Sequence, residues 1–253
     1  MIYDLQKASM WKRISAALFD GILLSIVVVL CAWLLSMALG FDGHMNTLEE
    51  KYTQYGETYN VNFNPTLSQY EAMTPEEMER LNTAYAELSK DDQAVYAYNM
   101  VVQLTLLITT IGILMGFLLL EFFIPLWLQN GQTLGKKIFG IGLMRTEGIK
   151  VNGVSLFIRT ILGKYTIETM VPVLIILMIF LGSLGLIGTI IVGLILLLQL
   201  GLLVFSRNRS LIHDVLATTV AVDIGSQMIF NTREDMIAYK QKKHAEMVAK
   251  QSY

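Results

Sequence analysis

Long apolar stretches without a charged residue dominate the pattern along the chain. They cover residues 21–41, 93–120 and 169–206, and the last of them is 38 residues long. As one helix, this stretch would extend about 57 Å, nearly twice the thickness of a bilayer hydrocarbon core of about 30 Å. It must therefore fold back on itself. The glycines within 182–188 suit the turn, because glycine tolerates the backbone angles that a tight turn requires.

Charged residues orient the resulting spans, because Lys and Arg near span ends are retained on the cytoplasmic side. Residues 40–99 contain eleven acidic and three basic residues, whereas 129–168 contain six basic and two acidic ones. We therefore expect an acidic extracytoplasmic loop and both termini in the cytoplasm. The predicted order is cytoplasmic 1–14, span 15–39, outer loop 40–99, span 100–128, cytoplasmic loop 129–166, spans 167–183 and 187–206, and cytoplasmic tail 207–253. A re-entrant hairpin over 167–206 is the alternative to the last two spans.

The outer loop contains local signals for helices. Thr74 is a good helix cap, and Pro75 suits the first helical position. We expect a helix from about Pro75 to Ser89 and another that begins near Asp91 and runs towards the second span. The loop is then either a small ordered cap or a solvated connector.

The cytoplasmic segments predict a small sheet. Residues 141–146 and 149–151 are typical of a hairpin, and the β-branched run 218–222 is a candidate third strand. Residues 154–164 show a helical pattern that suits a helix in the interface plane, and the charged tail from Met228 is predicted to be helical. The fold class is an all-α polytopic membrane protein with about four transmembrane helices and a small cytoplasmic β-hairpin or sheet.

Composition excludes several classes of protein. Hydrophobic residues make up 54% of the chain and charged residues 16%, which excludes a soluble monomer. The net charge of −2 gives no support for a nucleic-acid binder. The single Cys31 has no second thiol and no cluster of metal ligands beside it. No nucleophile arrangement or dinucleotide motif is present, so we expect neither an enzyme nor a cofactor.

Two carboxylates, Asp20 and Glu121, fall within predicted spans, where an ionisable group marks function or structural pairing. Arg13 precedes Asp20 by two helical turns, so both side chains project from one face. Glu121 is expected at a similar depth in the inner half of the membrane. An Arg with two acids in a low-dielectric crevice could hold an exchangeable proton or cation. The alternative is a structural ion network that joins the first two helices.

Two further polar clusters lie on the predicted cytoplasmic side. Ser210 can cap a short helix that carries His213 and Asp214, where His213 is either a proton relay or a plain hydrogen-bonding residue. The run 131–137, with Lys136 and Lys137, lacks the spacing of a Walker A loop. We interpret it as a tight turn whose lysines contact anionic lipid headgroups.

Three segments in the same order resemble the RDD family of bacterial membrane proteins, which is named for an Arg and two Asp. They are 12–21, the G-x-T-x-G-K segment 131–141, and the L-H-D-x-x-A-x-T-like segment 211–219. The resemblance covers about residues 7–224 and implies a bacterial cell-membrane protein, with Arg13, Asp20 and Asp214 as the name-giving residues. Some members are proposed to be sodium/proton antiporters, so the resemblance also implies cation transport. The acidic outer loop is longer than in many members.

Two functions remain open at this point. The first is exchange of protons for a small monovalent cation, with Asp20 and Glu121 as alternating sites, Arg13 tuning them, and His213 and Asp214 as an inner gate. Four spans are few for alternating access, so this function implies a homo-oligomer. The second is a non-transporting accessory or scaffold protein that binds partners through loop 40–99 or anionic lipid through its basic inner surfaces.

Overall fold

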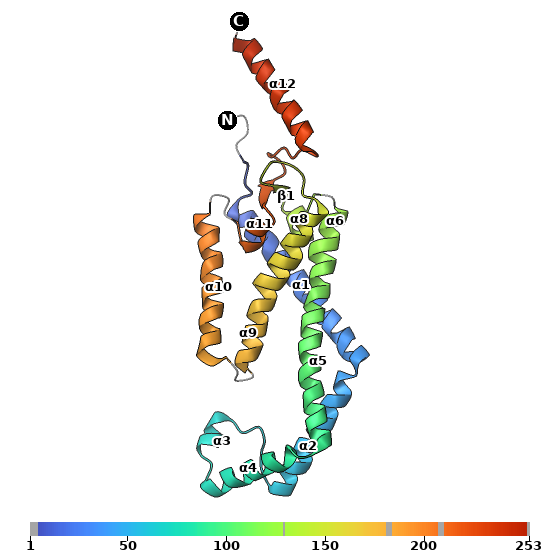
Figure 1. Cartoon of the computed structure of the whole chain (residues 1–253), viewed down its shortest axis with the longest axis vertical. Coiled ribbons are helices and arrows are strands. Elements are labelled where there is room, and N and C mark those ends of the chain that lie inside the picture. Colours follow the sequence, from blue (N-terminus) through green and yellow to red (C-terminus); the bar gives the residue numbers. More distant parts are fainter. Residues whose placement is uncertain (1–4, 129, 181–183, 207–209, 252–253) are drawn as a thin grey trace. The chain divides into compact units, whose positions relative to one another are not determined.

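The structure, a computed structural model, describes residues 5–128, 130–180, 184–206 and 210–251. Its internal contacts divide the chain into two compact units. The loop unit is Val29–Gly112, and the core unit combines Met1–Val28 with Ile113–Tyr253. In chain order, with η for a π-helix, the elements are α1 (Met10–Leu39), α2 (Phe41–Tyr59), α3 (Leu67–Glu71), α4 (Pro75–Leu88), α5 (Asp92–Gly116), η1 (Phe117–Phe123), α6 (Ile124–Trp127), α7 (Leu134–Ile138), β1 (Ile141–Arg145), α8 (Gly153–Phe157), η2 (Ile158–Met170), α9 (Val171–Phe180), α10 (Gly185–Phe205), α11 (Ile212–Leu216), β2 (Thr219–Asp223) and α12 (Arg233–Gln251) (Figure 1).

Four helices in the described residues are long and apolar enough to cross a membrane. They are Met10–Leu39, Asp92–Trp127, Gly153–Phe180 and Gly185–Phe205. Most of their apolar side chains are exposed, among them Phe205 with 87% of its surface. Apolar surface on this scale requires cover by lipid or by protein. The all-α polytopic membrane fold is therefore confirmed.

The third of these helices differs from the prediction. Residues 154–164 do not form a separate interfacial helix, because α8, η2 and α9 make one continuous helix over Gly153–Phe180. Its basic side chains Arg159 and Lys164 turn into a polar cavity of the core unit, so nothing requires a break before the span. α9 packs beside α10 (Figure 1). Of the predicted turn at 182–185, residues 182 and 183 lie outside the described residues, and Gly185, where α10 begins, has a positive φ of 43°.

The small sheet has two strands. β1 and β2 are antiparallel, with Leu143 opposite Ala221. The predicted hairpin is present in short form, because Lys150 pairs antiparallel with Met144 and the Arg145 amide donates to the Ile149 carbonyl at 2.9 Å. The predicted strand at 218–222 is present as β2 and forms the longer pairing with β1. Four of the five residues of β2 are buried, whereas Ile149 and Lys150 are only half-buried. The two pairings coexist, because Met144 pairs with both Val220 of β2 and Lys150; the pairing with β2 removes more apolar surface from water.

The loop unit is an ordered helical structure. α4 begins at the predicted Pro75, and the helix expected near Asp91 begins at Asp92 and continues to Trp127. Both predictions are confirmed. The long helix α2 and the short α3 had no counterpart in the prediction. α2 packs against α4, and Leu48 and Leu81 on these two helices are buried.

We predict that Thr74→Ala locally destabilises α4. The Thr74 hydroxyl accepts a hydrogen bond from the Glu77 amide, and the Glu77 carboxylate accepts one from the Thr74 amide in return. Loss of such a cap costs about 1 kcal/mol, or roughly a fivefold change in an opening equilibrium. Hydrogen exchange of the amides in residues 76–80 of the full chain should accelerate by about that factor. Thr74→Ser should exchange like wild type, and equal rates in all three proteins would contradict the role of the cap.

Candidate functional site

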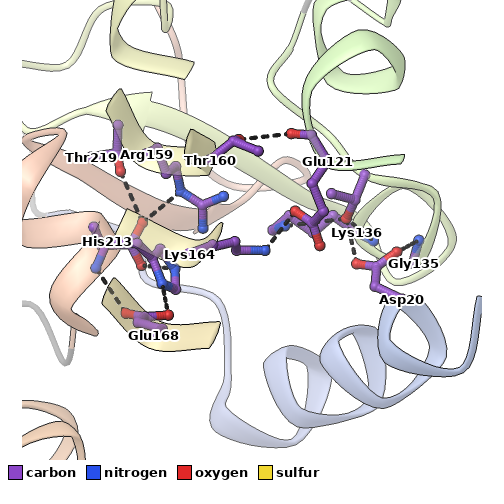
Figure 2. Close-up of polar contacts among 12 residues, drawn as sticks. Asp20, Glu121, Gly135, Lys136, Arg159, Thr160, Lys164, Glu168, His213 and Thr219 are labelled. Atoms are coloured by element: carbon purple, nitrogen blue, oxygen red, sulfur yellow. Dashed lines mark hydrogen bonds and ion pairs between the residues drawn. The ribbon is translucent and has the colours of Figure 1, made fainter. Parts of the chain in front are cut away.

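A cavity of about 230 Å³ lies inside the core unit and is lined by charged side chains from helices far apart in sequence. Its acidic residues are Asp20, Glu121, Glu168 and Asp214, and its basic residues are Arg13, Lys136, Arg159, Lys164 and His213. Figure 2 shows most of these groups pointing towards one another. All five predicted ion-handling residues are among them. The structure therefore gathers in one cavity the residues that the sequence singled out.

Asp20 is held by the N-terminal end of α7, at the N-cap Thr133 and at Gly135. One carboxylate oxygen accepts a hydrogen bond from the Gly135 amide at 2.7 Å, and the other accepts one from the Thr133 hydroxyl. A side chain at Gly135 would come within 2.5 Å of the Ala16 carbonyl oxygen on α1. Glycine is therefore required for this close approach. The run 131–137 is a carboxylate-binding turn that docks on α1.

Lys136 faces this cavity, which corrects the prediction that its ammonium contacts lipid headgroups. Its Nζ atom donates to the Thr133 hydroxyl at 3.1 Å, next to Asp20 (Figure 2). Burial, followed by the nearby charges of Lys164 and Arg159, lowers the pKa of Lys136 to about 7. Lys137 is exposed and remains the candidate for headgroup contact.

Glu121 is paired with a residue that the sequence interpretation did not single out. Lys164 Nζ lies 2.5 Å from its carboxylate, and the Thr160 hydroxyl donates to its backbone carbonyl at 2.9 Å. Glu121 lies in η1, while Lys164 and Thr160 lie in η2. π-helical segments are frequent at functional sites. Here they join two candidate spans through charged and polar groups.

Asp214 on α11 is the most fully enclosed carboxylate of the cluster, with 2% of its surface exposed. Its Oδ1 atom accepts from Arg159 Nε at 2.9 Å and from the Thr219 hydroxyl at 2.8 Å. Arg13 lies 4.0 Å from Oδ2. Burial alone would raise the pKa of Asp214, but the Arg159 guanidinium and His213 hold it well below its usual range. The ion pair of Arg13 is thus with Asp214, whereas the sequence predicted one with Asp20 and Glu121.

His213 joins α11 to the helix Gly153–Phe180. Its Nδ1 atom hydrogen-bonds with the Glu168 carboxylate at 2.7 Å, and its backbone amide donates to the same carboxylate at 2.9 Å. The predicted cap at Ser210 is therefore wrong: the N-cap is Leu211, without a side-chain hydrogen bond, and Glu168 from another helix satisfies the amide instead. His213 also lies 3.5 Å from Asp214.

The order and placement of these groups agree with a known family. The RDD family model matches residues 7–218. This chain belongs to the RDD family. Comparisons with curated proteins and with solved structures gave no significant match.

The three residues that the sequence assigned to the name-giving positions of the RDD family lie in two neighbouring parts of one cavity. Arg13 and Asp214 form one part together with Arg159, and Asp20 forms the other with the N-terminal end of α7. The surroundings of Asp20 and Asp214 therefore differ. Asp214 is bound to positive charges, whereas among the described residues no Lys, Arg or His side chain forms an ion pair with Asp20.

Sequence reasoning missed four residues of the RDD site: Thr133, Arg159, Lys164 and Glu168. Thr133 belongs to the G-x-T-x-G-K segment, which marks its hydroxyl as a possible partner for a buried acid. The other three belong to the segment that the sequence pattern assigns to an interfacial helix and the start of a span. In the described part of the chain, no three His, Cys, Asp or Glu side chains converge as metal ligands.

Proposed function

We propose that this RDD membrane protein exchanges protons for a small monovalent cation, with Asp20 as the site that binds one or the other. The observation that supports this most is the state of Asp20. Its carboxylate lines the cavity and is held by two neutral hydrogen-bond donors, Thr133 and Gly135. The nearby Lys136 ammonium contacts the Thr133 hydroxyl and forms no ion pair with Asp20, so the carboxylate itself can take up a proton or a cation.

The other three acids of the cavity support a different role. Glu121 and Asp214 each have a basic group at ion-pair distance, Lys164 and Arg159, and Glu168 is hydrogen-bonded with His213. Displacing such a partner would leave a buried charge uncompensated, which is costly. We therefore assign Glu121 to charge compensation beside the site, and His213 with Asp214 to the inner end of the cavity, where a gate would close. Of the two alternating sites that the sequence predicted, Asp20 and Glu121, the proposal therefore keeps only Asp20.

The charge distribution along the chain supports a membrane and an orientation for the proposed exchange. The basic segment 129–168 and the acidic segment 40–99 favour a bacterial cell membrane with both termini in the cytoplasm. The cavity would then open towards the cytoplasmic side of the lipid bilayer. Because four spans are few for a complete alternating-access pathway, the proposal includes a homo-oligomer. It includes no enzymatic activity, cofactor or nucleic-acid partner.

The proposal is tested with everted membrane vesicles that contain a pH-sensitive dye. Wild-type protein should release protons on addition of Na⁺, K⁺ or Li⁺, and Asp20→Asn should abolish this response because the neutral amide binds neither a proton nor a cation. The matched control is Asp223→Asn, which removes an exposed ion pair with Lys12 outside the cavity. Equal amounts of each protein must be present in the membrane.

The outcome that contradicts exchange is specific. If wild-type vesicles show no cation-dependent proton movement for any of the three ions, the exchange function is wrong. If Asp20→Asn retains full exchange, the function stands but the site is wrong.

A second candidate function is a non-transporting accessory protein that binds partners through loop 40–99. The observation that favours it is the order of this segment, in which three helices, α2, α3 and α4, enclose cavities of their own. A plain connector between two spans needs no such structure. Absence of exchange in wild-type vesicles, together with co-purification of a partner that is lost when 41–90 is replaced by a short linker, would favour this function.

A further inference from the structure

A groove of about 1000 Å³ lies entirely within the loop unit, between α2, the segment 60–64 and Tyr85 on α4. Three aromatic rings line it, those of Tyr52, Phe63 and Tyr85, together with the carboxylates of Glu49 and Glu57. Ligand sites typically have volumes of about 300–1,000 Å³ and combine apolar walls with a few polar groups. The groove has a volume at the upper end of this range, and its lining is more polar, because Thr53 and three asparagines, Asn60, Asn62 and Asn64, line it as well.

The aromatic wall is preformed. The Phe63 ring packs edge-on against Tyr52 at 5.2 Å and against Tyr85 at 4.9 Å between ring centroids. The Tyr85 hydroxyl donates to the Phe63 backbone carbonyl at 3.2 Å, and the Val61 amide donates to the Gly56 carbonyl at 2.9 Å. These contacts fix the segment 60–64 against α2 and α4. A ligand would therefore meet rings that are already oriented, which lowers the entropy cost of binding.

The groove is also negatively charged without internal compensation. Residues 29–112 are all described, and within them neither Glu49 nor Glu57 forms an ion pair. The two lysines of this segment are engaged elsewhere, Lys51 with Asp91 and Lys90 with Glu87, each at 2.7 Å. No basic residue lines the groove. It therefore attracts a positive charge.

We propose that this groove binds a small organic cation, an ammonium group carried on an apolar body. A cation over aromatic faces is attracted by the ring quadrupole, and the carboxylates of Glu49 and Glu57 add a complementary charge. Met45 and Leu48, which also line the groove, would contact the apolar part of the ligand. A bare metal ion fits less well, because no three His, Cys, Asp or Glu side chains among the described residues converge as metal ligands. An anion would be repelled. The proposal does not depend on the exchange function assigned to the core unit.

The test uses the purified full-length protein in detergent micelles and isothermal titration with benzyltrimethylammonium chloride at low salt. We expect saturable binding with a Kd of about 1 mM or tighter. Tyr52→Leu removes a ring face, and the double variant Glu49→Gln, Glu57→Gln removes the charge. Each should weaken binding by about threefold or more. Glu79→Gln, an exposed acid on α4 that does not line the groove, should bind like wild type.

Two further titrations make the result decisive. Benzyl alcohol, an uncharged aromatic with a similar body, should bind more weakly than the ammonium probe, and raised salt should weaken only the ammonium probe. The proposal is overturned if the ammonium probe gives no saturable heat at millimolar concentration, or if it binds equally to wild type, Tyr52→Leu and the double Glu variant. It is also overturned if a lysine-rich peptide binds and the small cation does not. Circular dichroism of each variant shows whether it is folded.

Discussion

Asp214→Asn is expected to lower the free energy of unfolding by about 3–5 kcal/mol, because it leaves a buried guanidinium uncompensated. Arg159 has 3% of its surface exposed and pairs with Asp214 at 2.9 Å. An Asn at this position can still accept hydrogen bonds from Arg159 and Thr219, but it carries no charge. The measurement is thermal unfolding of the purified protein in detergent by circular dichroism. The midpoint should fall by roughly 6–20 °C.

Two controls separate the buried pair from a general effect of losing an acid. Asp223→Asn removes an exposed ion pair with Lys12, whose side chain is 45% exposed, and should change stability by no more than about 1 kcal/mol. The double variant Asp214→Asn, Arg159→Met removes both buried charges and should recover part of the loss. The Asp214–Arg159 pair does not contribute the expected energy of about 3–5 kcal/mol if Asp214→Asn unfolds at the same temperature as wild type. The same conclusion follows if the double variant is less stable than Asp214→Asn.

The pH dependence of the same variant has a definite sign. Burial acts to raise the folded-state pKa of Asp214, but the nearby charges, Arg159 above all, hold it well below its usual range. An acid of this kind contributes stability that is present above its unfolded pKa of about 3.9 and is lost as pH falls through the lower folded-state value. Wild-type protein should therefore lose stability below about pH 4, and Asp214→Asn should lose less over the same range.

Structural features that depend on only a few neighbouring residues were predictable from the sequence. The spans follow from charge-free apolar runs, and α4 follows from the sequence Thr74-Pro75 with Glu77 three residues after the cap. The same holds for the family motifs, which place Arg13, Asp20 and Asp214 in order along the chain. These features need no knowledge of which helix packs against which.

The pairing of charges across the core unit was not predictable in the same way. Two residues five apart are turned about 140° from each other on an α-helix, so Arg159 and Lys164 would be assigned to different faces. They lie in η2, where the i→i+5 pattern of a π-helix brings residues five apart close to one face. No residue type marks a π-helix in the sequence. The partner of Asp20 was hidden for another reason, because one donor is the backbone amide of Gly135, which every residue but proline possesses.

The packing of the helices around the cavity also depends on close contacts that only glycine permits. A side chain at Gly163 would come within 2.6 Å of the His213 Cα atom, and one at Gly135 within 2.5 Å of the Ala16 carbonyl oxygen. Glycine can mark a close approach in a sequence, but it does not name the element that approaches. The two glycines therefore explain why α11 and α7 reach the charged residues. They are the positions at which the site is most sensitive to a single added methyl group.

Gly135→Ala is expected to destabilise the core unit and to stop the proposed exchange. The added methyl group meets a backbone carbonyl and the Asp20 carboxylate, whose Cγ atom would lie at 2.9 Å. Backbone atoms cannot rotate away, so α7 must move from α1, and Asp20 loses its two donors. Overpacking of this kind costs about 1–3 kcal/mol and more where the backbone must shift. The measurements are the unfolding midpoint in detergent and the dye response of everted vesicles.

The matched control is Gly21→Ala, which lies next to Asp20 on α1 and whose added methyl group meets nothing within 4 Å. Because alanine favours a helix over glycine by about 1 kcal/mol, this variant should be as stable as wild type or more so and should keep its exchange activity. Gly135→Ser should behave like Gly135→Ala, since any Cβ atom causes the clash. A Gly135→Ala protein with wild-type stability and exchange would show that α7 does not need to dock on α1 for Asp20 to work.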